Sequence, residues 1–111
     1  MGQGVASGVE QSRAAVEKAT RDVAKARDKE ADAAGKVRVA EQQLQALRDR
    51  GVTDAGRLAA AEERQATARR RAEAAARDTT QATNNLSEAE RRAADAARQA
   101  GDATEDSGRR A

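Results

Sequence analysis

The larger apolar residues recur at every seventh position in the first half of the chain, chiefly at Val9, Val16, Val23, Val37 and Leu44. In the second half, alanine occupies every seventh position from residue 61 to residue 103. A seven-residue repeat places the recurring side chains along one seam of an α-helix, and two such seams favour helices that pack as a coiled coil. The pattern therefore predicts an all-α protein.

A glycine separates the two repeats and is the strongest helix stop in the sequence. As a left-handed residue after a helix, Gly51 would place Val52 against Leu47, which is the spacing of a Schellman motif. Thr53 or Asp54 could then cap the next helix. Because so short a connection joins them, we expect two antiparallel neighbouring helices.

The predicted boundaries follow from these stop and start signals. Ser7 and Glu10 have the spacing of a capping box, which predicts a helix start next to Ser7. A second stop is expected at Gly101. The expected segments are a flexible tail at 1–6, a hairpin at 7–100 with helices at about 8–50 and 55–100 around a turn at 51–54, and a frayed polar tail at 101–111. The polar segment 79–87 leaves a local kink of the second helix open.

An antiparallel register with Leu47 opposite Leu58 pairs large side chains with small ones. Val23 then faces Ala82, and Leu44 faces Ala61, which lets the helices approach closely. Four seam positions are polar, at Ser12, Glu30, Gln65 and Thr79. Glu30 could reach Arg27 or Arg71, but we expect it to stay hydrated. The predicted seam comprises Val9, Val16, Val23, Val37, Leu44, Leu47, Leu58, Ala61, Ala68, Ala82, Leu86 and Ala89.

The expected fold is thus an Ala-rich coiled-coil hairpin with little area to bury. The chain has no aromatic residue and no proline, and most of its apolar residues are alanine. At about 25 cal/mol per Å², burial of a Val and Ala seam stabilises the fold about half as much as burial of a Leu seam of equal length. We therefore expect the hairpin to associate with itself or with a partner helix, as part of a larger helical bundle.

Composition argues against several classes of function. The chain has no Cys and no His, which removes thiol chemistry and the usual zinc ligands. Two helices offer no concave site, so we expect no enzyme, no catalytic residue, no metal and no cofactor. No stretch is apolar enough for a membrane span or a cleaved signal, so we expect a cytoplasmic protein or one exported without such a signal.

Basic residues gather around the middle of the chain although the net charge is only +2. This possible basic patch could meet an acidic partner, a nucleic-acid backbone or a lipid headgroup. It could equally be a solvated face, because Glu62, Glu63 and Glu73 are interleaved with it. Nucleic acid is disfavoured because no aromatic residue can stack on bases. The patch comprises Lys36, Arg50, Arg57, Arg64, Arg69, Arg70 and Arg71.

The favoured function is a non-catalytic interaction module: a scaffold, an adaptor or a subunit of an assembly. In outline, with two helices around the central turn 51–56, the chain also resembles the Trp-X-Gly family of type VII secretion substrates and partners. That resemblance implies pairing with a second hairpin and export. The turn has no Trp, however, and the chain has no Tyr for the family's export signal.

A third interpretation is a hydrophilic stress protectant. The composition, rich in Ala and charge and without Cys or Trp, is similar to that of late-embryogenesis-abundant proteins. That similarity implies eleven-residue repeats and disorder in dilute buffer. The repeat here is seven residues long, and the turn is well specified.

Overall fold

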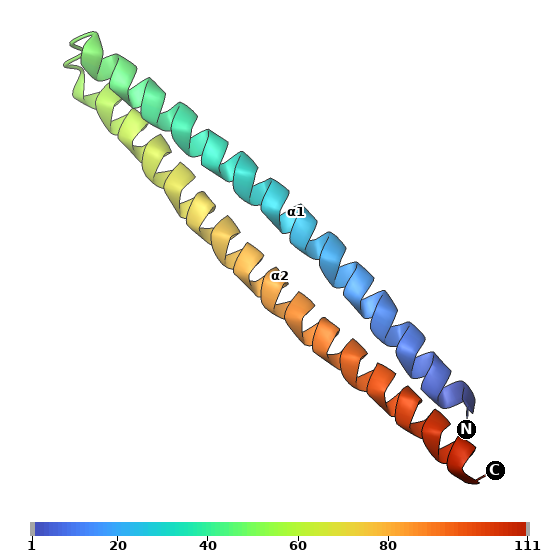
Figure 1. Ribbon diagram of the computed structural model, residues 1–111. Coiled ribbons are helices and arrows are strands. Elements are labelled where there is room, and N and C mark those ends of the chain that lie inside the picture. The colour runs from blue at the N-terminus through green and yellow to red at the C-terminus, as the bar shows by residue number, and fades with distance from the viewer. Residues whose placement is uncertain (1, 111) are drawn as a thin grey trace. The chain divides into compact units, whose positions relative to one another are not determined.

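The computed structural model describes the backbone of residues 2–110 and the side chains of residues 8–102. It contains two helices, α1 (Gly2–Asp49) and α2 (Ala55–Arg110), joined by a short turn (Figure 1). The helices pack against each other, and the described backbone has no strand. This confirms the predicted all-α helical hairpin.

The chain divides into two compact units, and each unit contains a segment of both helices. Unit 1 consists of the residues up to Ala24 and those from Gln81 onward, whereas unit 2 consists of Lys25–Thr80. Unit 2 therefore contains the turn. Each unit is described separately below.

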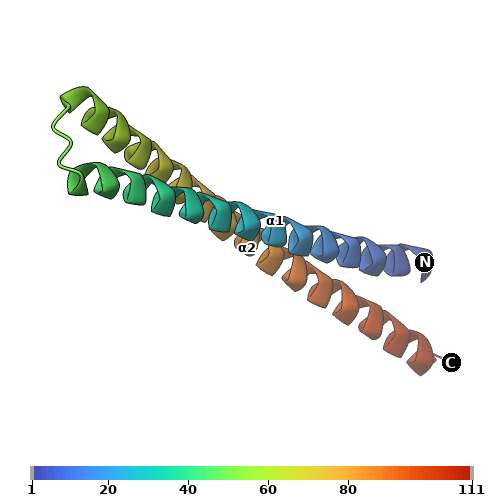
Figure 2. The same ribbon diagram turned by 90° about the horizontal axis from the view of Figure 1, so that it is seen from above.

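The turn in unit 2 has the predicted Schellman geometry. Gly51 has a φ angle of 69°, which is the left-handed conformation that glycine adopts without strain. Its amide donates to the Arg48 carbonyl at 3.0 Å, and the Val52 amide donates to the Leu47 carbonyl at 3.1 Å. Figure 2 shows the resulting short connection between the end of α1 and the start of α2.

Asp54 caps the N-terminus of α2, which settles the choice between the two predicted caps. Its Oδ1 accepts hydrogen bonds from the amides of Gly56 at 2.9 Å and Arg57 at 3.2 Å. These amides have no partner within the helix, so the carboxylate satisfies two of the unpaired donors. The negative charge also lies at the positive end of the helix dipole.

Both helices extend further than the sequence predicted. α1 begins at Gly2, so Ser7 lies inside the helix rather than at its start. α2 continues past Gly101 to Arg110, through the segment expected to fray. A glycine inside a helix costs only about 1 kcal/mol relative to alanine, and no proline is present to stop either helix. The side chains of Ser7, the expected cap, and of Ala103 lie outside the described residues.

The polar segment 79–87 is part of the continuous helix α2. Thr79 Oγ1 donates to the Ala75 carbonyl and Thr80 Oγ1 to the Ala76 carbonyl, both at 3.1 Å. This back-bonding satisfies hydroxyls that would otherwise compete with the backbone, so poor helix formers are accommodated.

Each unit buries a small apolar set along one face of its helix pair. Among the described residues, unit 1 buries Ala19, Val23 and Ala89, whereas unit 2 buries Ala26, Ala40, Leu44 and Ala61. Leu44 and Ala61 are both only 2% exposed. In unit 1 the predicted seam residues that are buried or half-buried are Val9, Val16, Val23, Ala82, Leu86 and Ala89; in unit 2 they are Val37, Leu44, Leu47, Leu58, Ala61 and Ala68.

Candidate functional site

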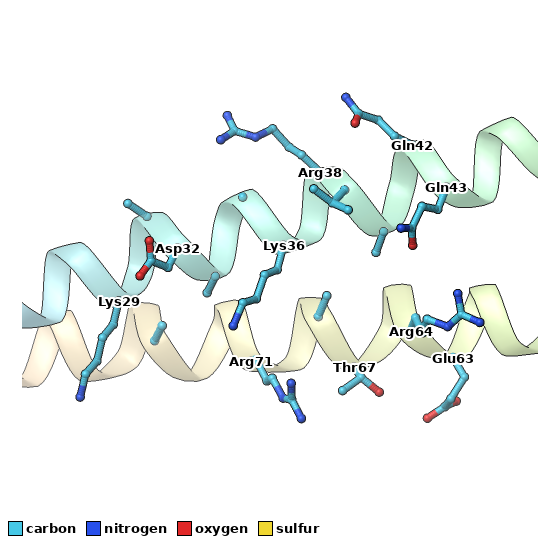
Figure 3. A pocket seen from close by; sticks show the side chains of 17 residues that line it. Lys29, Asp32, Lys36, Arg38, Gln42, Gln43, Glu63, Arg64, Thr67 and Arg71 are labelled. Carbon is cyan, nitrogen blue, oxygen red and sulfur yellow. The ribbon is translucent and has the colours of Figure 1, made fainter.

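A groove of about 1130 Å³ runs between the two helices of unit 2 (Figure 3). Its surface combines small residues, including Ala33, Gly35, Ala40 and Ala68, with long charged side chains. The charged residues are mostly basic: Lys29, Lys36, Arg38, Arg64 and Arg71, against Asp32 and Glu63.

Four of the basic residues form a row that we call the basic edge: Lys29 and Lys36 on α1, and Arg64 and Arg71 on α2. Each directly precedes a seam position, at 30, 37, 65 or 72, so all four lie on the same side of the seam. In Figure 3, Lys29 and Lys36 extend from α1 in the direction of α2, whereas Arg38 points away from it. The two helices therefore carry positive charge along the same edge.

The basic edge has no ion pair within the described part of the chain. The salt bridges and side-chain hydrogen bonds among residues 8–102 do not involve Lys29, Lys36, Arg64 or Arg71. Nothing in that part of the protein therefore neutralises their charges at contact distance. Like charges facing each other across a helix pair disfavour that pairing by a few tenths of a kcal/mol each.

Asp78 also directly precedes a seam position, 79, so it lies on the same side one heptad beyond Arg71, and it has no ion pair among the described residues. The other nearby acidic residues form no ion pair with the basic edge either. Glu63 forms its ion pair with Arg70, at 3.3 Å, and Arg70 also donates to Thr67 Oγ1 at 3.1 Å. Asp32 lies between Lys29 and Lys36 on α1, but no salt bridge joins it to either one. Glu30 is half-buried in the seam, and the described residues include no ion-pair partner for it.

The other side of the seam carries matched charges, and we call it the paired edge: Glu41, Arg48, Glu62 and Arg69. Arg69 pairs with Glu41 at 3.0 Å, and Arg48 pairs with Glu62 at 3.8 Å. Each of these residues directly follows a seam position, so they lie opposite the basic edge. The two bridges are seven residues apart on both helices, so they hold one register between α1 and α2 in unit 2.

The residues of the predicted basic patch have different surroundings in the structure. Lys36, Arg64 and Arg71 line the groove, whereas Arg69 and Arg70 are ion-paired and Arg57 lies 3.9 Å from Asp54. Arg50 is exposed at the end of α1, beside the turn. The prediction missed two basic groove residues, Lys29 and Arg38. The seven-residue spacing from Lys29 to Lys36 was the signal that could have found the first.

Unit 1 has a smaller hollow of about 350 Å³. It is lined by Arg13, Val16, Glu17, Glu90 and Ala93, which carry charges of both signs. Asp22 pairs with Lys18 and Asp95 with Arg98 in the same unit, each along its own helix. Beside its seam, unit 1 has no row of basic residues on both helices within residues 8–24 and 81–102, whereas Glu88, Asp95 and Asp102 form an acidic row on α2.

Two further features of the described residues bear on function. No group of three or more acidic, His or Cys side chains lies together there as a possible metal site. No helix in that part of the chain has an apolar stretch long enough to cross a membrane. Comparison with protein-family models, with curated proteins and with solved structures gives no match.

Proposed function

We propose that the protein is a non-catalytic helical-hairpin module that binds through helix packing, as a scaffold, adaptor or subunit of an assembly. The observation that carries this proposal is the modest burial between its two long helices. Helices of 48 and 56 residues bury only seven apolar side chains among the described residues, and five of these are alanine.

Such a core contributes little against the conformational entropy of folding. An alanine methyl removes far less apolar area from water than a leucine or a phenylalanine side chain. Ordering each residue of the backbone costs about 1–2 kcal/mol, which helix formation offsets only in part. A further packed helix would bury more area and stabilise the hairpin by binding its folded state.

The groove in unit 2 provides a surface for such packing. It lies between two helices and combines small side chains with charged residues at its rim. Small residues allow a third helix to approach closely, and charges that flank a packed seam select its partner. This surface supports an interaction role without any catalytic group.

The proposal is tested by measuring helicity and molar mass over a wide range of protein concentration. We expect circular dichroism to show a melting temperature that falls on dilution, or one that rises when a binding helix is added. Sedimentation equilibrium reports the mass under the same conditions. A monomer with unchanged helicity and melting temperature at every concentration, and unaffected by every added helix, would contradict the proposal.

The same spectra separate the alternative of a stress protectant. A protectant of that kind would be mostly coil in dilute buffer and become helical only on drying. The secretion alternative has its own observation, namely recovery of the protein from culture medium together with a second hairpin. Neither outcome is expected if the chain acts as an intracellular scaffold.

A further inference from the structure

We infer that the basic edge of unit 2 is a docking site for an acidic amphipathic helix of another protein. This inference rests on the proposed interaction function and names the chemistry of the partner. The occupant is a helix with Asp or Glu at heptad-spaced positions flanking a stripe of small or medium apolar residues. The observation that selects an acidic partner is the positive charge of the basic edge, which an acidic helix would complement.

In the hairpin alone, the charges of the basic edge are arranged unfavourably. Lys29 and Lys36 face the same groove as Arg64 and Arg71, and none of the four has an ion pair among the described residues. The paired edge shows that this chain can match charges across its seam, at Glu41–Arg69 and Arg48–Glu62. Carboxylates from a partner would supply the missing charges on the basic edge.

An apolar surface lies beside the charges of the basic edge. Val39 is 52% exposed and is the only exposed large apolar residue that the described chain contains. It lines the groove one turn beyond Lys36, together with Ala40 and Ala68. A partner helix packed there would remove Val39 from water while its acidic residues meet the basic edge.

The spacing of the charges along the basic edge matches the heptad spacing of side chains on a partner helix. The basic residues repeat at seven positions on both helices, a rise of about 10.5 Å. A partner helix that presents Asp or Glu every seventh residue would keep the same spacing along the groove. A nucleic acid fits this surface less well. The chain has no aromatic residue that could stack on bases, and the groove includes the apolar Val39 beside its cations.

A second copy of this chain fits poorly if it meets the first copy through the same edge. Two copies that meet through this edge would place Lys and Arg against Lys and Arg, which is repulsive. The acidic residues that repeat at seven positions in unit 1 are Glu88, Asp95 and Asp102 on α2, and Asp95 already pairs with Arg98. An acidic helix of another protein therefore fits this edge better than the same edge of a second copy does.

The test uses the full chain and a stapled helical peptide of about three heptads as the probe. The peptide carries Glu at the heptad positions that flank an Ala/Leu stripe, and a matched peptide carries Gln at the same positions. We expect fluorescence anisotropy to show binding of the Glu peptide, with affinity at least about tenfold above that of the Gln peptide. This preference should shrink as salt is added, because exposed charges are screened.

Two variants locate the site. The Arg64→Glu/Arg71→Glu variant should lose at least about tenfold in affinity for the Glu peptide. Arg27→Glu/Arg77→Glu changes the net charge equally at exposed positions that do not line the groove, and it should bind nearly as wild type does. Circular dichroism checks that both variants are helical. The first should be at least as stable as wild type because its new carboxylates face Lys29 and Lys36.

Several results would overturn the inference. Equal binding of the Glu and Gln peptides would remove the charge argument, and equal loss in both variants would move the site away from the basic edge. Tighter binding of a short RNA or DNA duplex than of the Glu peptide would indicate a nucleic-acid partner instead. If neither peptide binds but melting still depends on protein concentration, the docking site fails while the proposed interaction function stands.

Discussion

The two edges of the helix pair in unit 2 have opposite electrostatic character although they flank the same seam. On the paired edge, Glu41 meets Arg69 and Arg48 meets Glu62, so each charge has its counterpart on the other helix. On the basic edge, Lys29 and Lys36 share a groove with Arg64 and Arg71, and none of the four has an ion pair among the described residues. One edge therefore stabilises the hairpin, and the other works against it.

This difference separates folding from binding within one short unit. Cross-helix ion pairs on the paired edge favour the observed register, as charges flanking coiled-coil seams do. The basic edge has no such ion pair among the described residues, and carboxylates of a partner would supply its counterions. A surface that is locally unfavourable for stability is where functional residues are expected.

The largest expected effect on stability comes from a substitution in the seam that both edges share. Leu44→Ala removes a side chain that is only 2% exposed, opposite the equally buried Ala61 in the predicted register. Leu-to-Ala changes in buried positions cost about 2–5 kcal/mol, which should abolish folding of a marginal hairpin near room temperature. Thermal melting by circular dichroism measures the loss. A change in melting temperature of only a degree or two would contradict the seam described here.

The turn should give the next largest effect because it aligns both edges. Gly51→Ala places a Cβ on a residue with a φ of 69°, where no other atom lies within 4 Å. The cost is therefore backbone strain alone, about 1–2 kcal/mol. Urea unfolding measures it, and Gly101→Ala serves as a control in α2, because its Cβ would also meet no atom within 4 Å and its φ is not positive. Equal stability of Gly51→Ala and wild type would show that the left-handed turn is dispensable.

A charge reversal on the basic edge should stabilise the chain by a smaller amount. Arg71→Glu has no charged neighbour three or four positions away on α2, so its effect reports mainly on the charges of α1 that face it, Lys29 and Lys36 against Glu30. We expect a gain of about 0.5–1 kcal/mol in the free energy of unfolding at low salt. Arg71→Gln should gain about half as much. A loss of stability in Arg71→Glu would mean that Arg71 has a favourable partner in the hairpin.

The smallest effect is expected on the paired edge. Glu41→Arg should lower the free energy of unfolding by about 0.2–1 kcal/mol, because Arg69 is exposed and Glu41 is only half-buried, so solvent screens their ion pair. Adding Arg69→Glu restores an opposite-charge pair with reversed polarity. The double variant should therefore recover most of the loss, and a double-mutant cycle measures this coupling. Additive losses in the cycle would indicate that the ion pair contributes nothing to stability.

The sequence predicted the backbone of unit 2 well because the signals there are local. A glycine in the left-handed conformation has few substitutes, so Gly51 and the amide of Val52 could be placed in advance. Asp54 was one of two predicted caps, and its hydrogen bonds to Gly56 and Arg57 decide between them. The helix ends were predicted less well because Gly2, Gly4 and Gly101 weaken a helix without forbidding it.

The candidate site could be predicted only in part. Composition located the basic region, but it did not separate residues that pair from residues that do not. Arg69, Arg70 and Arg71 are consecutive, yet they point to different sides of α2 because successive helical residues are about 100° apart. Arg69 consequently meets Glu41, Arg70 meets Glu63, and Arg71 lines the groove. Heptad position, rather than charge density, decides which arginine is available to a partner.

The most direct test observes the arginine side chains individually during binding. Nitrogen-15 spectra of the arginine Nε–H groups, recorded while the stapled Glu peptide is added, report which edge the peptide contacts. We expect the signals of Arg64 and Arg71 to shift and those of Arg48 and Arg69 to stay in place. Shifts at Arg48 and Arg69, with Arg64 and Arg71 unchanged, would contradict the assignment of the basic edge as the docking surface.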